Sequence, residues 1–189
     1  MPSVTELLDM TGRTAIVTGG ASGLGEATAR SLAEKGALVS IFDLNEDKGN
    51  KVAADIGGDF LSCDVASEAS VQGALDAAKE KNGVARILIN CAGIAAGSRT
   101  VGRDGAHSLE LYTKIVTVNL IGTFNMTRLF AVDASAAEPL NDDGERGVVV
   151  MTASVAAYEG QIGQVAYSAS KGGIVGMTVP IARDLSSRG

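Results

Sequence analysis

A tyrosine and a lysine four positions apart, Tyr167 and Lys171, are the side chains of this sequence best suited to acid–base chemistry. If the segment is helical, this spacing places the phenol and the ammonium on one face, a single turn apart. Ser154, which precedes the tyrosine at the expected end of a strand, would bring a hydroxyl to the same place. Together the three groups could move a proton to or from an alcohol oxygen, although a Tyr–Lys pair alone arises by chance in many helices.

The other reactive side chains offer weaker alternatives. The only histidine, His107, lies in a polar stretch before an expected helix, where a surface or capping role is favoured over a general base. No histidine pair, Cys-x-x-Cys or carboxylate cluster occurs at ligand spacing, so we expect no metal site. Cys63 and Cys91 lie far apart in the chain, without the spacing of metal ligands, and are expected to be free thiols in a reducing compartment.

A glycine-rich turn follows the first expected strand, residues 14–18, and leads into a helix. Its glycines would let the backbone turn tightly and bring amides close to a pyrophosphate at the helix N-terminus. The spacing G-x-x-x-G-x-G differs from the usual G-x-G-x-x-G, but the physical reason is the same; a turn without a ligand is the alternative. The candidate cofactor-binding residues of this turn are Gly19, Ser22, Gly23, Leu24 and Gly25.

Asp43 closes the second expected strand, which follows the helix that the glycine turn begins. A carboxylate there can accept hydrogen bonds from both ribose hydroxyls and would repel a 2′-phosphate, which favours NAD over NADP. No basic residue follows until Lys48, in agreement with that preference. A surface aspartate that opens a turn is the alternative.

Further candidates lie where other expected strands end, at the sheet edge where ligands bind. The small residues after the fourth strand would let the cofactor's ribose approach the backbone, although Cys91 is more simply a buried apolar residue. After the third strand, the Asp64 carboxylate and the Val65 amide could contact an adenine. A capping or turn role for Asp64 is nearly as plausible. Asn119, inside an expected helix, is a poor interior helix residue whose spacing alone indicates no function. The strand-end candidates are Asp64, Val65, Asn90, Cys91, Ala92 and Gly93.

Short apolar runs alternate with helical stretches, which is typical of parallel β-α-β units with helices on both faces of the sheet. The sequence therefore predicts an α/β fold, a Rossmann-type doubly wound parallel sheet in three layers, as a single domain over residues 1–189. The expected strands are residues 14–18, 37–42, 60–62, 84–90 and 147–152. The expected helices are residues 23–35, 67–81, 108–134 and 164–187, with loops at 95–107 and 138–144.

Composition excludes several classes of function. Of 189 residues 46% are hydrophobic, and 16 basic against 22 acidic side chains give a net charge of −6, which does not favour nucleic acid as a partner. No apolar stretch reaches the roughly 18 residues needed to span a membrane, so no membrane partner is expected. Residues 1–9 lack an apolar signal core and an arginine-rich presequence, which predicts a cytoplasmic protein.

Taken together, these segments resemble the short-chain dehydrogenase/reductase family, in the family's order and at its spacings over essentially the whole chain. Residues 152–161, 167–178 and 125–129 are most similar to the 3-hydroxyacyl-CoA dehydrogenases of that family, which oxidise fatty 3-hydroxyacyl-CoA thioesters and hydroxysteroids with NAD. The matching residues are Thr18 to Gly25, Asp43, Asp64, Asn90 to Gly93, Asn119, Ser154, Tyr167 and Lys171.

The resemblance implies a role for each matching position. Tyr167 would be the general acid or base, and Lys171 would bind the nicotinamide ribose and favour the phenolate. Ser154 would hold the substrate oxygen, and Asn119 would hold a water in a proton relay, against the reading from spacing alone. Gln161 would touch the substrate, and the family's tetramers imply a homo-oligomer built through the helices at 108–134 and 164–187.

The chain departs from the family in length, because members of the family are usually longer. Relatives continue with a sixth strand, a substrate lid and a seventh strand. We therefore expect this chain to be a C-terminally incomplete part of a longer one, with an exposed edge at the fifth strand. The sequence leaves two alternatives to a 3-hydroxyacyl-CoA dehydrogenase: a 3-oxoacyl-carrier-protein reductase, and a non-catalytic nucleotide-binding or assembly module.

Overall fold

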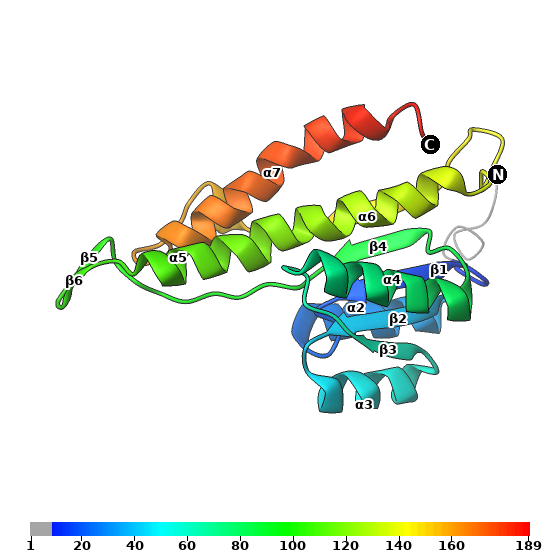
Figure 1. The fold of residues 1–189 in the computed structure, drawn as a ribbon, viewed down its shortest axis with the longest axis horizontal. Helices are drawn as coiled ribbons and strands as arrows, with labels where there is room; N and C mark the ends of the chain where they lie inside the picture. Colours follow the sequence, from blue (N-terminus) through cyan, green and yellow to red (C-terminus); the bar gives the residue numbers. More distant parts are fainter. Residues whose placement is uncertain (1–8) are drawn as a thin grey trace.

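Five parallel strands form the central sheet of the computed structural model, which describes residues 9–189 (Figure 1). Their order is β3-β2-β1-β4-β7. The successive strands are therefore added toward one edge as far as β3 and toward the opposite edge from β4 onward, and the order reverses between β1 and β4. Thr18 pairs with Phe42 on one side and with Asn90 on the other, which aligns the carboxyl ends of the strands at one edge. The strands are β1 (Thr14–Thr18), β2 (Leu38–Asp43), β3 (Asp59–Ser62), β4 (Ile87–Asn90) and β7 (Val148–Met151).

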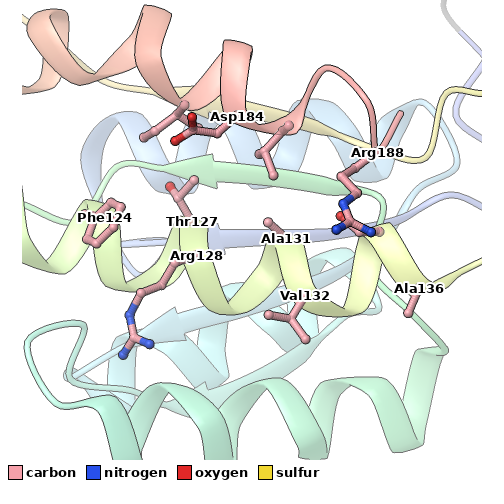
Figure 2. Close-up of a pocket in the computed structure, with 11 residues that line it drawn as sticks. Phe124, Thr127, Arg128, Ala131, Val132, Ala136, Asp184 and Arg188 are labelled. Atoms are coloured by element: carbon pink, nitrogen blue, oxygen red, sulfur yellow. The ribbon is translucent and has the colours of Figure 1, made fainter.

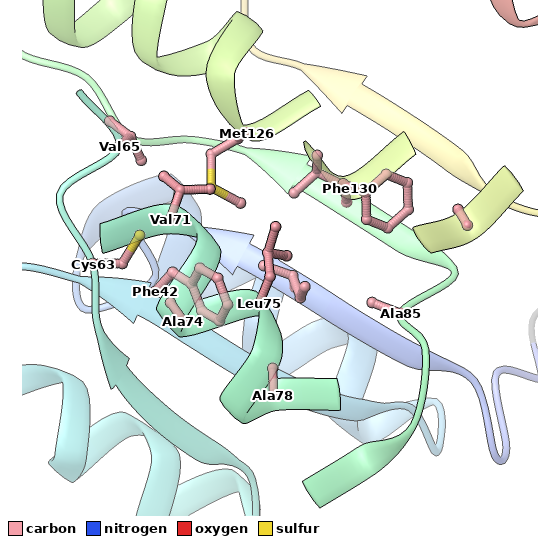
Figure 3. Packing of buried hydrophobic residues seen from close by; sticks show 13 residues of the cluster. Phe42, Cys63, Val65, Val71, Ala74, Leu75, Ala78, Ala85, Met126 and Phe130 are labelled. Atoms are coloured by element: carbon pink, nitrogen blue, oxygen red, sulfur yellow. The ribbon is translucent and has the colours of Figure 1, made fainter. Parts of the chain in front are cut away.

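Helices cover both faces of the sheet and give the predicted three layers. Residues of α2 and α3 pack on one face, and residues of α4 and α6 pack on the other (Figures 1 and 3). Met126 and Phe130 of α6 meet Val71 and Leu75 of α4 over β1 and β4. The helices are α2 (Gly23–Glu34), α3 (Glu46–Ile56), α4 (Glu68–Asn82), α5 (Leu109–Val116), α6 (Gly122–Ala136) and α7 (Val165–Leu185).

The expected strands and helices are all present, and α3 is an additional helix that the sequence reading did not include. Its signals were local: the Asn45 side chain accepts a hydrogen bond from Lys48 N, and Gly57 closes the helix in the left-handed conformation at φ 67°. The stretch 95–107, expected to be a loop, also contains the short hairpin β5 (Val101–Gly102) and β6 (Gly105–Ala106).

The expected helix over 108–134 is interrupted by a π-helical turn, Thr117–Ile121, between α5 and α6. Asn119 lies at its centre, and Thr123 Oγ1 donates a 2.7 Å hydrogen bond to the Asn119 carbonyl. Such turns insert one residue into a helix and are frequent at functional sites. The weak helix propensity of asparagine indicated that the helix is irregular near Asn119, but it did not predict a π-helical turn.

The continuous helical stretch Leu109–Ala136 is, by length and composition alone, long and apolar enough to cross a membrane. The expectation that no segment of the chain passes this test was therefore wrong. Half of its most apolar window is buried inside the structure, however, and the core helix of a globular protein passes the same test. Residues 1–8, which include most of the segment examined for targeting signals, lie outside the described residues.

Strand β7 forms one edge of the sheet within residues 9–189, as expected for the fifth strand. Its outward side chains, Val148 and Val150, are 45% and 47% exposed. Beside it, the carbonyl of Gly189 accepts a 2.6 Å hydrogen bond from Arg146 N, so the end of the described chain lies next to the start of β7.

Candidate active site

Tyr167 and Lys171 lie in the first turns of α7, as their spacing predicted. The Lys171 ammonium is 5.7 Å from the centre of the Tyr167 ring. It donates a 2.6 Å hydrogen bond to the carbonyl of Thr152, the residue that follows β7. Lys171 is 5% exposed, and this burial lowers its pKa from the ordinary value near 10.5, because a low-dielectric surrounding disfavours the charged form.

Ser154 comes from the end of β7, just beyond Thr152. Its hydroxyl caps the short 3₁₀ turn Val155–Ala157 by accepting a 3.1 Å hydrogen bond from Ala156 N. This turn packs on α7: a methyl group on Gly172 would lie 3.8 Å from the Ala157 carbonyl. The serine is thereby held beside the helix that carries the tyrosine and the lysine.

Asn119 is fully buried, and its side-chain amide bridges two parts of the chain. Its Oδ1 accepts a hydrogen bond from Ile94 N at 2.7 Å, and its Nδ2 donates to the Ile94 carbonyl at 2.9 Å. The same Nδ2 donates to Ser170 Oγ at 3.1 Å. The spacing of Asn119 could not indicate this burial or these contacts, because they depend on residues far away in sequence.

The glycine-rich turn makes a close backbone crossing at the start of α2. Gly19 has φ 65°, and a Cβ there would lie 2.8 Å from the Cα of Ala92. A Cβ on Gly25 would overlap the Gly19 carbonyl. Ser22 N-caps α2 without a side-chain capping bond among the described residues, so the amides of Gly23 and Leu24 begin the helix as free anion-binding donors.

Asp43 lies directly beside this turn. One carboxylate oxygen accepts a hydrogen bond from Ala21 N at 3.1 Å and the other from Asn45 N at 2.9 Å. Both bonds hold the carboxylate at the carboxyl end of β2, with lone pairs left for further donors. Acceptance of hydrogen bonds from ribose hydroxyls at this carboxylate stays a prediction.

A cavity of about 690 Å³ opens next to Asp43, between the ends of β2 and β3 and helix α5. Asp64 lines it and also accepts a 2.9 Å hydrogen bond from Ala66 N, as expected of an aspartate in a turn; contact of Asp64 with an adenine stays a prediction. Val65 points into the core instead, and its carbonyl accepts from Asn125 Nδ2 at 2.9 Å. The cavity is lined by Leu44, Asp64, Ala66, Leu109, Glu110, Thr113, Lys114, Thr117 and Val118.

The segment after β4 crosses the glycine turn and reaches Lys171. Thr18 Oγ1 accepts hydrogen bonds from Cys91 N at 3.2 Å and Ala92 N at 3.1 Å. Asn90 Oδ1 is buried and has no hydrogen-bond partner among residues 9–189, which leaves an acceptor facing inward. A methyl group on Gly93 would lie 3.9 Å from Lys171 Nζ, so this glycine keeps the space beside the ammonium open.

The two cysteines have no disulfide partner in the described part of the chain. Burial raises the pKa of the Cys63 thiol to about 12, so it is a core residue rather than a nucleophile. Cys91 Sγ lies 3.6 Å from Thr152 Oγ1 at the edge of the site. Gln161 is exposed, and its backbone N donates to Gln164 Oε1 at 2.9 Å; no contact brings it to the other candidates within residues 9–189.

The structure gives contacts at the site to three polar residues to which the sequence assigned no role: Thr18, Thr152 and Ser170. Thr18 connects the glycine turn to the segment after β4 by hydrogen bonds. The Thr152 carbonyl accepts a hydrogen bond from Lys171, and the Ser170 hydroxyl accepts one from Asn119. Only their place at strand ends or beside the lysine could have indicated them. The groups at this sheet edge fit a dinucleotide, because Asp43, the glycine turn and Asn90 follow the adjacent strands β2, β1 and β4, and the segment after β4 reaches Lys171.

Comparisons with known proteins agree with this geometry. Residues 13–189 match the family model of the short chain dehydrogenases. The 3-hydroxyacyl-CoA dehydrogenase type-2 of Drosophila melanogaster is 53% identical over 178 residues, covering 92% of this chain and 69% of the relative; that of Homo sapiens is 50% identical over 182 residues, covering 94% and 69%. The crystal structure of 3-hydroxyacyl-CoA dehydrogenase type-2 from Mycobacterium avium superposes with a TM-score of 0.89 at 47% identity, covering 94% of this chain and 71% of that one.

The α/β sheet, the glycine turn and the Tyr–Lys pair thus lie in a chain about half identical to these relatives over most of its length. The chain belongs to the short chain dehydrogenase family, oxidoreductases that interconvert alcohols and ketones with a nicotinamide cofactor, NAD or NADP.

Proposed function

We propose that this protein interconverts a 3-hydroxyacyl-CoA and the corresponding 3-oxoacyl-CoA with NAD, in fatty acid metabolism. The observation that carries the proposal is the buried Lys171 ammonium 5.7 Å from the Tyr167 ring, in a fold whose glycine turn is hydrogen-bonded to Asp43. The substrate class is supported by the names of relatives that are 50% and 53% identical to this chain. A hydroxysteroid is a second substrate of the same chemical kind, a secondary alcohol.

The acid–base step falls to three side chains. Ser154 Oγ holds the substrate oxygen by a hydrogen bond, and the Tyr167 phenolate accepts the proton of the alcohol, or returns it to the carbonyl in the reverse direction. Lys171 stabilises the phenolate by Coulombic attraction, which is strong because the site is buried. Asn119 supports a route for the proton to solvent, and Gln161 contacts the acyl substrate.

The cofactor, when bound, supplies the chemistry of hydride transfer. The first turn of α2, with Gly19, Gly23 and Gly25, would hold the pyrophosphate, and Asp43 would accept from the ribose hydroxyls. A carboxylate at this position repels a 2′-phosphate, which is why we propose NAD rather than NADP. The cavity at Asp64 would receive the adenine, with the Val65 amide beside it, and Asn90 to Gly93 with Lys171 would hold the nicotinamide ribose.

We also propose that the protein is a cytoplasmic homotetramer associated through α6 and α7. A groove of about 530 Å³ lies between these two helices, with Phe124 and Val132 on one wall and Asp184 and Arg188 on the other (Figure 2). Phe124 and Val132 are 46% and 67% exposed, and an apolar surface of this kind favours association with another copy. The free thiols agree with a reducing compartment.

The test is NADH-linked reduction of acetoacetyl-CoA by the wild type, by Tyr167→Phe and by the control Tyr112→Phe on α5, whose ring lies against His107. We expect Tyr167→Phe to lower kcat by about 10²- to 10⁴-fold while NAD still binds, because only the proton transfer is removed. Turnover by Tyr167→Phe equal to that of Tyr112→Phe would refute the assigned role. A strong preference for NADPH and an acyl-carrier-protein thioester would instead identify a 3-oxoacyl-carrier-protein reductase.

A further inference from the structure

Ser170, between Tyr167 and Lys171 on α7, is completely buried. Its hydroxyl makes two hydrogen bonds: it donates to the carbonyl of Tyr167 at 2.7 Å and accepts from Asn119 Nδ2 at 3.1 Å. A hydroxyl has one proton, so a bond donated to Tyr167 leaves only lone pairs for Asn119. The direction of both bonds is therefore determined.

The Asn119 amide on the other side of this contact has no freedom to rotate. Its oxygen accepts from Ile94 N, and its amide nitrogen serves both the Ile94 carbonyl and Ser170. Flipping the amide would place N–H against N–H at Ile94 and an acceptor against the serine. A continuous hydrogen-bond chain thus runs from the backbone after β4, through the π-helical turn, to the first turn of α7.

This chain of hydrogen bonds ends at the backbone carbonyl of Tyr167, in the helical turn that carries the acid–base pair. The Ser170 hydroxyl fixes the carbonyl of Tyr167 within the turn that separates the phenol from the ammonium. On the other side, a methyl group on Gly93 would be 3.2 Å from Asn119 Oδ1 and 3.9 Å from Lys171 Nζ, so the Asn119 amide borders the same space as the lysine. A rotation of this turn would change both the Tyr167–Lys171 distance and their distance from the segment after β4.

We infer that Ser170 is a positioning residue for the acid–base pair: it locks the first turn of α7 against Asn119 and so sets the separation of the Tyr167 phenol and the Lys171 ammonium. The inference rests on the proposed function. Coulombic stabilisation of a phenolate falls with distance from the ammonium, so a looser turn requires a higher pH for the same fraction of reactive base.

The test compares Ser170→Ala with Ser168→Ala in the same helix. Ser168 is a matched control, because its hydroxyl has no hydrogen-bond partner among the described residues. For oxidation of 3-hydroxybutyryl-CoA with NAD, we expect Ser170→Ala to lower kcat about tenfold or more with KM changed less than threefold. The pH at half-maximal kcat is expected to move upward by about half a unit or more. Ser168→Ala is expected to keep both values.

Three results would overturn the inference: wild-type kcat in Ser170→Ala, an equal loss in Ser168→Ala, or a loss of kcat with an unmoved pH profile, which would indicate general destabilisation. If the wild type itself fails to turn over, the proposed substrate is wrong. Urea unfolding of Ser170→Ala, Asn119→Ala and the double variant then tests whether the Asn119–Ser170 hydrogen bond couples the two residues. Non-additive shifts of the midpoint support the link, and additive shifts refute it.

Discussion

The Lys171 ammonium lies 2.6 Å from the carbonyl oxygen of Thr152 and forms no ion pair with a carboxylate in the described part of the chain. A buried cation whose protein acceptor is neutral costs free energy, because a carbonyl dipole replaces only part of the lost hydration. The lowered pKa of Lys171 has the same cause. The positive charge of Lys171 therefore does not stabilise the fold.

Replacing this cation by an apolar side chain of similar length, Lys171→Met, should slow turnover strongly without lowering stability. At pH 7 we expect kcat to fall by about 10²-fold or more, and the unfolding midpoint to equal or exceed that of the wild type. Because the folded-state pKa is below the unfolded value near 10.5, the cost of burying the charge is present at neutral pH and disappears as pH rises toward 10.5. The stability advantage of the variant should shrink over that range.

Thermal unfolding at several pH values measures this effect, with Lys51→Met on the exposed surface of α3 as the matched control. A variant at Lys171 that is clearly less stable than the control at pH 7 would show that the bond to Thr152 outweighs the desolvation of the ammonium.

Asp43→Ala should change the choice of cofactor. The carboxylate is positioned by Ala21 N and Asn45 N, and we expect it to accept from the ribose. Hydrogen bonds to a charged group contribute about 1.5–3 kcal/mol, so the Kd of NAD should rise roughly 10- to 100-fold. NADP should bind better than to the wild type, because the repulsion of its 2′-phosphate is removed. Titration calorimetry with both cofactors measures the ratio, and Asp47→Ala on α3 is the control; an unchanged ratio would show that Asp43 does not select the cofactor.

Gly25→Ala should damage the cofactor turn. The added methyl group would overlap the Gly19 carbonyl, which is backbone and cannot move aside as a side chain could. Overpacking of this kind costs about 1–3 kcal/mol of stability, and the displaced turn should bind NAD at least tenfold more weakly. Gly73→Ala in α4 is the matched control, since nothing lies within 4 Å of its added Cβ, and it should be neutral or stabilising by about 0.5–1 kcal/mol. Equal behaviour of the two variants would contradict the close crossing.

Val132→Glu should disrupt the proposed tetramer. A buried carboxylate without a partner in an α6–α7 interface would cost several kcal/mol per contact, while on a free surface it would cost almost nothing. Light scattering after gel filtration should show a smaller assembly for Val132→Glu and an unchanged one for Val101→Glu on the exposed hairpin. Identical masses for both variants and the wild type would place the interface elsewhere or exclude it.

Local sequence was sufficient wherever the signal is periodic or lies at a strand end. The apolar run at 14–18, the glycine spacing at 19, 23 and 25, and the four-position interval from Tyr167 to Lys171 each predicted the element that the structure contains. Parallel strands align their carboxyl ends, so the residues that follow them could be assigned to one edge of the sheet without coordinates. Helix α3 was not predicted, although its caps, Asn45 and Gly57, are equally local signals in the sequence.

What the sequence by itself determined is therefore the order of the candidate groups along the sheet edge: a glycine-rich turn, an acidic strand end and a Tyr–Lys pair on one helix, because these depend on backbone periodicity and on residues close together in the chain. The tertiary structure decided which distant partners meet. Asn119 meets Ser170, and Lys171 meets Thr152, across separations that no spacing rule relates. Their contacts arise because a π-helical turn, the end of β7 and the first turns of α7 pack together, and most polar groups buried by such packing are stabilised by a hydrogen-bond partner.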